Sequence, residues 1–317
     1  MKARALGPLR HVCSGCGGSC HGTLVSTMPD ERAALRERAR VLGVEGPFDG
    51  IHLRMEHGRC VFLDAEGRCR LHARFGPDAK PRVCSQYPRV VVRTPTETRI
   101  GLDPGCYSAH ASWRHGPQTS VPLGLLGVDS ALNDTQRRQE RALLGVTAPG
   151  ATVAGVIRAM CPAEPGDVEL PRGFATRWVQ SLQAARLRPV LERDECGAVM
   201  RDALLPVLDA AATWDASKPP TWPALAASED AWAVETARRM VFLRLAPEIP
   251  LVPATAVLAL GGAVACGWTH TDPVPFGRAL AAWSRAMRAA PFWRALLPQP
   301  DRLHWLATGE GSVRPGI

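Results

Sequence analysis

Several features that define other protein classes are missing from these 317 residues. No apolar stretch of secretory length follows the start, so we expect a cytoplasmic chain that is not exported. No collagen-like or other internal repeat occurs, which excludes fibrous proteins. The glycine-rich step from strand to helix that is typical of Rossmann-type methyltransferases is absent as well.

Lysine and aromatic residues are scarce. Arginine supplies 35 of the 38 basic residues, and aromatic residues make up 6% of the chain. Residues 1–117 carry 18 basic against 11 acidic residues, which accounts for +7 of the formal net charge of +8. These arginines are not interleaved with aromatic rings on which bases could stack, so nucleic acid is not an expected partner. Thiolates bound to metal would cancel much of this positive charge.

Cysteine, in contrast, is abundant and unevenly distributed. Seven of the ten cysteines lie within the first 106 residues, whereas eight of the nine tryptophans lie after residue 117. This change in composition near residue 117 predicts a cysteine-cluster domain at 1–117 and a helical domain at 118–317. In a reducing compartment, clustered cysteines indicate metal or redox chemistry rather than disulfides. We therefore expect a mainly α protein, with a small metal-stapled N-terminal domain of short strands followed by an all-α domain.

Helical periodicity dominates the second half. Apolar residues recur there three or four positions apart between Pro and Gly, as in Phe174, Trp178 and Leu182. Ser228 is a candidate N-cap. The uncharged stretch 251–268 approaches the length of a membrane span, but its Ala and Gly content fits a buried helix better. The predicted helices are 31–42, 130–144, 151–161, 174–187, 196–213, 228–245, 253–265 and 276–289, and the predicted strands are 51–54, 60–63 and 90–93.

The first cysteine motif reads Cys13-Ser-Gly-Cys16-Gly-Gly-Ser-Cys20-His21. Glycines between closely spaced thiols let the backbone wrap around one metal and point N–H groups at sulfur, which stabilises thiolate charge. A thioredoxin-like redox pair at Cys13 and Cys16 requires a βαβ unit, and none is visible. The spacing of two then three residues is the reverse of that in radical S-adenosylmethionine enzymes, so radical chemistry is not expected.

The second group of cysteines has a more specific pattern. It reads Cys60-Val-Phe-Leu, then Cys69-Arg-Leu-His72, then Lys80-Pro-Arg-Val-Cys84-Ser-Gln-Tyr87-Pro, with Cys106 as a late member. Together with the first motif it resembles the YkgJ-type cysteine-cluster family of zinc- or iron-chelating domains, which includes the flagellin lysine N-methylases. The resemblance covers about residues 11–110.

The resemblance implies a set of metal ligands that departs from the family in one place. Where the family has adjacent cysteines, this chain has Cys20 followed by His21, so imidazole replaces one thiol or that ligand is lost. Zinc and iron–sulfur clusters both accept thiolates together with some imidazole. Eight ligands suffice for two four-coordinate sites or for one cluster with spare thiols. The candidate metal ligands are Cys13, Cys16, Cys20, His21, Cys60, Cys69, Cys84 and Cys106.

The remaining cysteines and histidines lack such support. Isolated cysteines in predicted helices are interpreted as small core residues; these are Cys161, Cys196 and Cys266. His72 is a candidate ligand or hydrogen-bonding neighbour of the metal, with a structural role equally open. The other histidines of the first half are interpreted as surface or packing residues: His11, His52, His57, His110 and His115.

Two classes of function remain open. Resemblance to the methylase branch implies an enzyme that transfers a methyl group from S-adenosylmethionine to a lysine of a protein substrate. A base is needed for this reaction, and Tyr87, Tyr107 and Asp103 are the nearest candidates, although no catalytic residue is assigned. The alternative is a non-enzymatic zinc or iron–sulfur module for partner binding or electron transfer. In both cases we expect Cys13, Cys16, Cys60, Cys69 and Cys84 to converge in space, because each short motif offers too few thiolates to complete a tetrahedral site alone.

Overall fold

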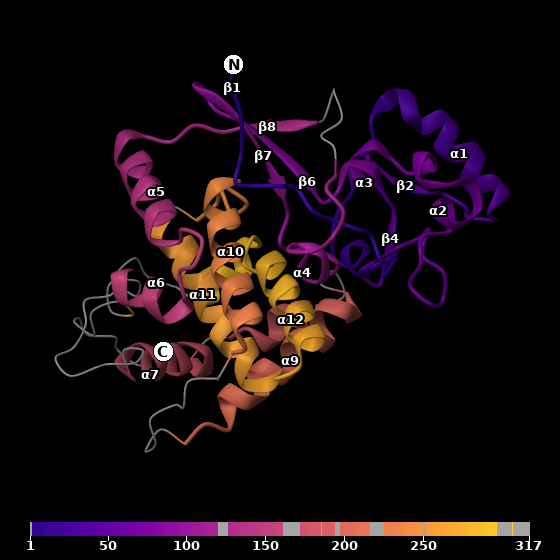
Figure 1. Ribbon diagram of the computed structural model, residues 1–317. Helices are drawn as coiled ribbons and strands as arrows, with labels where there is room; N and C mark the ends of the chain where they lie inside the picture. The colour runs from indigo at the N-terminus through magenta and orange to yellow at the C-terminus, as the bar shows by residue number, and fades with distance from the viewer. Residues whose placement is uncertain are drawn as a thin grey trace. The chain divides into compact units, whose positions relative to one another are not determined.

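The computed structural model describes residues 2–119, 126–160, 172–184, 186–193, 197–215, 225–249, 252–296 and 306 (Figure 1). The chain divides into two compact units. The first unit comprises Met1–Asp129 and Glu192–Arg201, and the second comprises Ser130–Leu191 and Asp202–Ile317. All strands of the described residues lie in the first unit, and helices build the second. The predicted mainly α fold, with short strands in the N-terminal part, is confirmed.

A four-stranded sheet forms one part of the first unit. Its strand order is β1 (Lys2–Ala5), β7 (Glu97–Leu102), β6 (Arg89–Arg93) and β8 (Gly127–Asp129). Strands β6 and β7 are antiparallel, whereas β1 pairs with β7 and β8 pairs with β6 in parallel. The sequence predicts β6 from its valines. It does not predict the other three, because polar residues interrupt any apolar alternation in them.

The rest of the first unit consists of short pieces around a small apolar cluster. Leu35 on helix α1 (Arg32–Val41), Phe62, and Leu71 on α2 (Arg70–Phe75) are almost fully buried in it. The strands predicted at 51–54 and 60–63 are reduced to two residues each. The short pieces are β2 (Phe48–Asp49), β3 (His52–Leu53), β4 (Met55–Glu56), β5 (Arg59–Cys60), α3 (Arg82–Gln86), α4 (Ala109–Ser112), and the 3-10 turns η1 (Gly18–Cys20), η2 (Pro29–Glu31) and η3 (Pro77–Ala79).

The second unit contains the long helices, and most of them lie within a few residues of their predicted positions. α9 runs through Pro206, and its first residues belong to the segment Glu192–Arg201 of the first unit. The helices are α5 (Asp134–Val146), α6 (Val153–Met160), α7 (Arg172–Ala184), α8 (Arg188–Leu191), α9 (Ala198–Ala212), α10 (Ala227–Phe242), α11 (Val252–Thr269), α12 (Pro273–Ala286) and α13 (Ala290–Leu296).

The N-cap predicted for α10 is wrong. The helix begins at Ala227, one residue before Ser228, and its N-cap residue Ala226 makes no side-chain cap hydrogen bond. The hydroxyl of Ser228 instead donates to Oε2 of Glu229 over 2.7 Å. Glu229 and Asp230 still place negative charge in the first turn, where it interacts favourably with the helix dipole.

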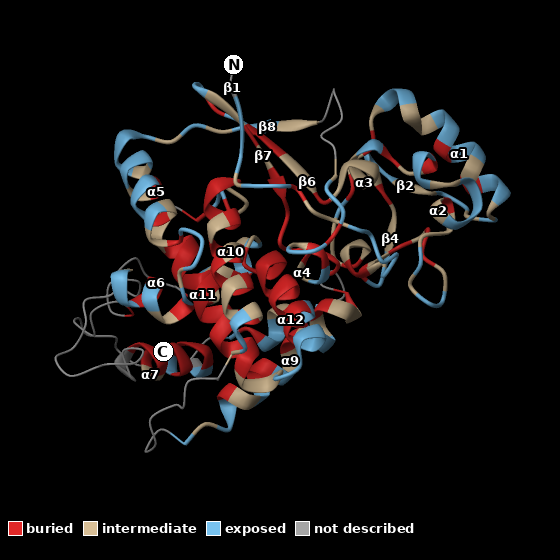
Figure 2. Cartoon of the chain, viewed as in Figure 1, coloured by how far each residue is buried: buried red, intermediate tan, exposed pale blue. Residues whose placement is uncertain are grey.

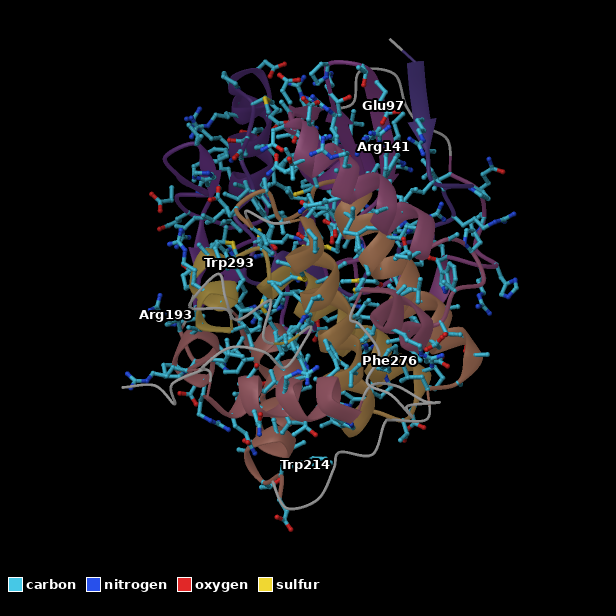
Figure 3. All side chains as sticks on the ribbon, turned by 90° about the vertical axis from the view of Figure 1, so that its left-hand side faces the viewer. Glu97, Arg141, Arg193, Trp214, Phe276 and Trp293 are labelled. Atoms are coloured by element: carbon cyan, nitrogen blue, oxygen red, sulfur yellow. The ribbon has the colours of Figure 1, made fainter. Side chains whose placement is uncertain are left out.

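Tryptophans fill the core of the second unit. Trp178 on α7 lies 6.1 Å from Trp283 on α12, and Trp283 meets Phe292 edge to face at 5.3 Å, measured between ring centroids. Phe276, labelled in Figure 3, is fully buried on α12. Buried residues dominate α10, α11 and α12 (Figure 2). Because apolar burial supplies the free energy of this core, we expect it to persist without metal.

Helix α11 is buried, as its Ala and Gly content predicts. In the described part of the chain it alone has the length and composition to cross a membrane, but 78% of it is buried inside the protein. Close helix packing requires small residues on its surface. The Cβ atom of a residue replacing Gly262 would lie 2.1 Å from the indole nitrogen of Trp283. This nitrogen donates a hydrogen bond to the carbonyl of Leu258 over 2.9 Å.

We expect Gly262→Ala to destabilise the second unit by about 2–3 kcal/mol, because the rigid indole has to leave its place and its hydrogen bond to Leu258 is strained. Urea unfolding followed by circular dichroism measures the change. Gly145→Ala on α5 is the matched control, since a side chain there meets no atom within 4 Å. That control should be neutral or slightly stabilising. Equal urea midpoints for the two variants would contradict the packing described for Trp283.

Candidate metal centre

The seven clustered cysteines line one cavity within the first unit. Its volume is about 530 Å³, and all of its lining residues come from positions 11–108. The two sequence motifs and the late Cys106 therefore border the same space. The lining cysteines are Cys13, Cys16, Cys20, Cys60, Cys69, Cys84 and Cys106.

Four of these cysteines gather on the apolar cluster of the first unit, and we call Cys20, Cys60, Cys69 and Cys84 the four-thiol group. Cys20 ends η1, Cys60 ends β5, Cys69 immediately precedes α2, and Cys84 lies in α3. Cys60 is a buried member of the cluster, and the other three pack against it. An antiparallel bridge between Leu63 and Cys69 closes the turn that returns Cys69 toward Cys60.

The other three cysteines, Cys13, Cys16 and Cys106, form a second group, which we call the three-thiol group. Ser108 links its two loops: the hydroxyl oxygen of Ser108 lies 2.7 Å from that of Ser14 and 3.9 Å from Sγ of Cys16. None of the three cysteines belongs to the apolar cluster that holds the four-thiol group. Cys13 and Cys16 are exposed, whereas Cys106 is buried.

A histidine that the sequence analysis set aside lies against the three-thiol group. Nε2 of His11 is 3.4 Å from Sγ of Cys106, and His11 lines the cavity. The sequence analysis interprets His11 as a surface or packing residue, and in the structure it is partly buried and packs beside Cys106 at the cavity wall. The signal in the sequence is its position two residues before Cys13, which extends the first motif to His-x-Cys-x-x-Cys.

His21 does not border the cavity. It is 7% exposed and forms an antiparallel bridge with Arg59, and a side chain at Gly197 would begin 3.0 Å from its Cβ. Its predicted role was to replace a thiol of the family's adjacent pair. In the lining of the cavity, the imidazoles are those of His11 and His72 instead.

Gly17 shapes the loop that carries the first motif. Its φ of +61° lies in the left-handed region, and a side chain there would begin 1.6 Å from the carbonyl oxygen of Gly67. Only glycine fits such an approach of two backbone segments without displacing one of them. The contact holds the loop between Cys16 and Cys20 against the turn that precedes Cys69, so that both groups face the cavity.

The buried thiols are protonated in the absence of a metal. Burial raises the pKa of Cys60 to about 11 and that of Cys106 to about 12. Burial also raises the pKa of Cys84, and the nearby thiols of the four-thiol group raise it further. The pKa of His11 is lowered to about 4 by burial and then by Arg89 and Lys80, so its imidazole is neutral at physiological pH. Neutral imidazole is the form that binds metals.

We expect the affinity for Zn²⁺ to fall steeply as the pH is lowered from 8 to 6. The raised thiol pKa values mean that protons must leave before sulfur can bind metal, and each proton released contributes about one power of ten per pH unit. Competition with a chromophoric chelator at several pH values measures the slope, and a pH indicator in weakly buffered solution counts the protons. An affinity independent of pH would show that thiols are not the ligands.

The donor atoms fit a thiophilic metal. Sulfur with imidazole suits zinc and iron–sulfur clusters, whereas magnesium and calcium require oxygen ligands. In the described part of the chain, no three His, Cys, Asp or Glu side chains converge closely enough to hold a metal ion as they stand. Sulfurs around tetrahedral zinc lie about 3.8 Å apart, because each bond is about 2.3 Å long. Tetrahedral binding of a metal by these thiols would require sulfurs that lie this close together.

Of the other residues singled out in the sequence, some line the cavity and some lie elsewhere in the chain. His72 and Tyr87 line the cavity. Asp103 accepts a hydrogen bond from the backbone N–H of Gly105 over 2.7 Å, which assigns it to the turn before Cys106. Cys266 is fully buried on α11, as predicted for a core residue, while Cys161 and Cys196 lie outside the described residues.

The comparisons with known proteins agree with the cysteine pattern. Residues 12–107 match the model of a family described as "CxxCxxCC: Putative zinc- or iron-chelating domain". This match confirms the resemblance to the cysteine-cluster family, spans all seven clustered cysteines, and begins one residue after His11. No curated protein and no solved structure matches the chain.

Proposed function

We propose that the zinc- or iron-chelating domain formed by residues 12–107 holds its principal metal through the four-thiol group, Cys20, Cys60, Cys69 and Cys84. The observation that carries this proposal is the packing of all four against one apolar cluster while they line one cavity. Four thiolates complete a tetrahedral zinc site or hold one [4Fe–4S] cluster. The metal then ties together η1, β5, α2 and α3, which share only a small core.

Two groups near the thiols favour the thiolate form, although burial raises the pKa of both Cys60 and Cys84. Lys80 lines the cavity, and its positive charge is close enough to Cys84 to favour the ionised form of that thiol. The N–H of Phe62 also hydrogen-bonds Cys60 and favours its thiolate. Four thiolates around a divalent ion carry a net charge of −2, so a nearby ammonium group and N–H donors stabilise the loaded site.

Protein purified without oxygen tests this proposal. Elemental analysis should give stoichiometric zinc or iron, and the absorption spectrum separates them, because an iron–sulfur cluster is brown and zinc is colourless. The absence of both metals from folded, reduced protein that also fails to take up added Zn²⁺ or Fe²⁺ with sulfide would refute it.

A second candidate function is methyl transfer from S-adenosylmethionine to a protein lysine. The observation that favours it is the size of the cavity, since about 530 Å³ is within the range of small-molecule sites and far exceeds what one metal ion needs. In this reaction the methyl group passes from the sulfonium to the lysine nitrogen, which loses a proton to a base, and S-adenosylhomocysteine leaves. Tyr87 is the cavity-lining residue among the predicted bases.

Calorimetry with S-adenosylmethionine and metal-loaded protein decides between the two candidates. Binding that is lost in a Cys84→Ser variant would support the methylase. Without measurable binding to the fully loaded protein, the structural metal module is the better account.

A further inference from the structure

We propose that Cys13, Cys16, Cys106 and His11 form a second, separate metal site of the Cys₃His type, which takes zinc. The inference rests on the proposed function in one respect, namely that this domain binds metal through its cysteines. It goes beyond that function by dividing the thiols into two sites and by assigning a histidine that lies outside the region matched by the family model.

The two groups of thiols differ in their surroundings. All members of the four-thiol group belong to the apolar cluster around Leu35 and Phe62 or pack against it. In the three-thiol group, Cys13 and Cys16 are exposed, and the buried Cys106 is not a member of that cluster. The three-thiol group is instead held together by polar contacts through Ser108, which reaches Ser14 and Cys16. One group is thus built on a core and the other on a pair of loops, and each has four candidate donors.

Backbone pairing with residues 117–119 holds the segment that carries His11. The carbonyl of Leu9 accepts from the N–H of Thr119 over 2.7 Å, and the N–H of His11 donates to the carbonyl of Pro117 over 3.1 Å. Arg10 forms an antiparallel bridge with Gln118 between them. This pairing presents the imidazole to Cys106, whose sulfur is 3.4 Å from Nε2. An imidazole held in this way loses little entropy on binding a metal.

Two sulfurs of the second site have hydrogen-bonding groups beside them. The N–H of Gly15 points to Sγ of Cys13 over 3.4 Å, and the hydroxyl of Ser108 lies 3.9 Å from Sγ of Cys16. Such donors stabilise metal-bound thiolates. Three thiolates and a neutral imidazole around Zn²⁺ carry a net charge of −1, and the donor set is one of the standard structural zinc sets.

Titration of the reduced, metal-free full-length chain with Zn²⁺, in competition with a chromophoric chelator, tests the second site. We expect two zinc ions per wild-type chain. The variant His11→Ala should keep one tight zinc and bind the other at least about tenfold more weakly, because a ligand is lost. His21→Ala is the matched control and should bind both ions as the wild type does. Circular dichroism confirms that each variant is folded.

The variant His11→Cys tests the second site by a gain of binding rather than a loss. It supplies a fourth thiol, so it should recover the second zinc, and in the Co²⁺-loaded protein it should increase the sulfur-to-cobalt charge-transfer absorption. A single zinc per wild-type chain, or unchanged binding in His11→Ala, would overturn the second site and leave the four-thiol site standing. A wild-type chain that binds no zinc and no iron would refute the proposed function itself.

Discussion

Removing the metal under reducing conditions should unfold much of residues 12–107 and leave the helices of the second unit intact. The apolar cluster of the first unit has few large members, among them Leu35, Phe62 and Leu71. Structural zinc sites contribute roughly 10–16 kcal/mol in small domains, more than a core of this size supplies. The second unit keeps its packed tryptophans whether or not metal is present.

Hydrogen exchange with and without a strong chelator measures this effect segment by segment. Amides of β4, β5, α2 and α3 should lose most of their protection, whereas those of α10, α11 and α12 should keep theirs. Adding back Zn²⁺ in excess is the control and should restore the protection. Equal protection of β5 and α3 in both conditions would show that the metal does not hold the domain together.

Replacing Cys84 by serine should weaken metal binding at the four-thiol group by more than about 100-fold. Cys84 is the α3 member of the group and lies near the other three thiols, so its loss opens the site to water. Even changes to groups that only orient a ligand cost 10–100-fold in metal affinity. Chelator competition on the reduced protein measures the change.

Cys266→Ala is the matched control for this substitution. Like Cys84, Cys266 forms no disulfide, but it is fully buried among the helices of the second unit. Its removal should leave metal affinity unchanged and only lower the stability of the helical core. Similar metal affinities in Cys84→Ser and Cys266→Ala would contradict the assignment of the four-thiol group.

The cysteine pattern predicts which cysteines line the cavity. It does not predict which of them belong to the four-thiol group and which to the three-thiol group. Spacing and family resemblance mark all seven cysteines, because each motif keeps its residues within a few positions of one another. The division depends on which thiols contact the apolar cluster, and that is a property of the folded chain. The position of His11 beside Cys106 is not visible in the sequence for the same reason, because it arises from backbone pairing with residues near Pro117, far away in the sequence.

Helices are predicted better than strands because their signal is local. α7 and α12 show an apolar residue every three or four positions, and this pattern is visible without knowledge of the partner. The strands β1 and β8 are short, and they exist because β7 and β6 offer free edges to them. Their residues, such as Arg4 and Asp129, carry no alternating pattern that would mark them in advance.

X-ray absorption at the edge of the bound metal tests the central claim most directly, because it identifies the neighbouring atoms and their distances. In zinc-loaded protein the account predicts a first shell dominated by sulfur at about 2.3 Å, with a smaller nitrogen contribution at about 2.0–2.1 Å from His11. The nitrogen contribution should disappear in His11→Cys, whereas it should remain in His21→Ala. A first shell made mainly of oxygen and nitrogen would contradict a metal site built from these clustered thiols.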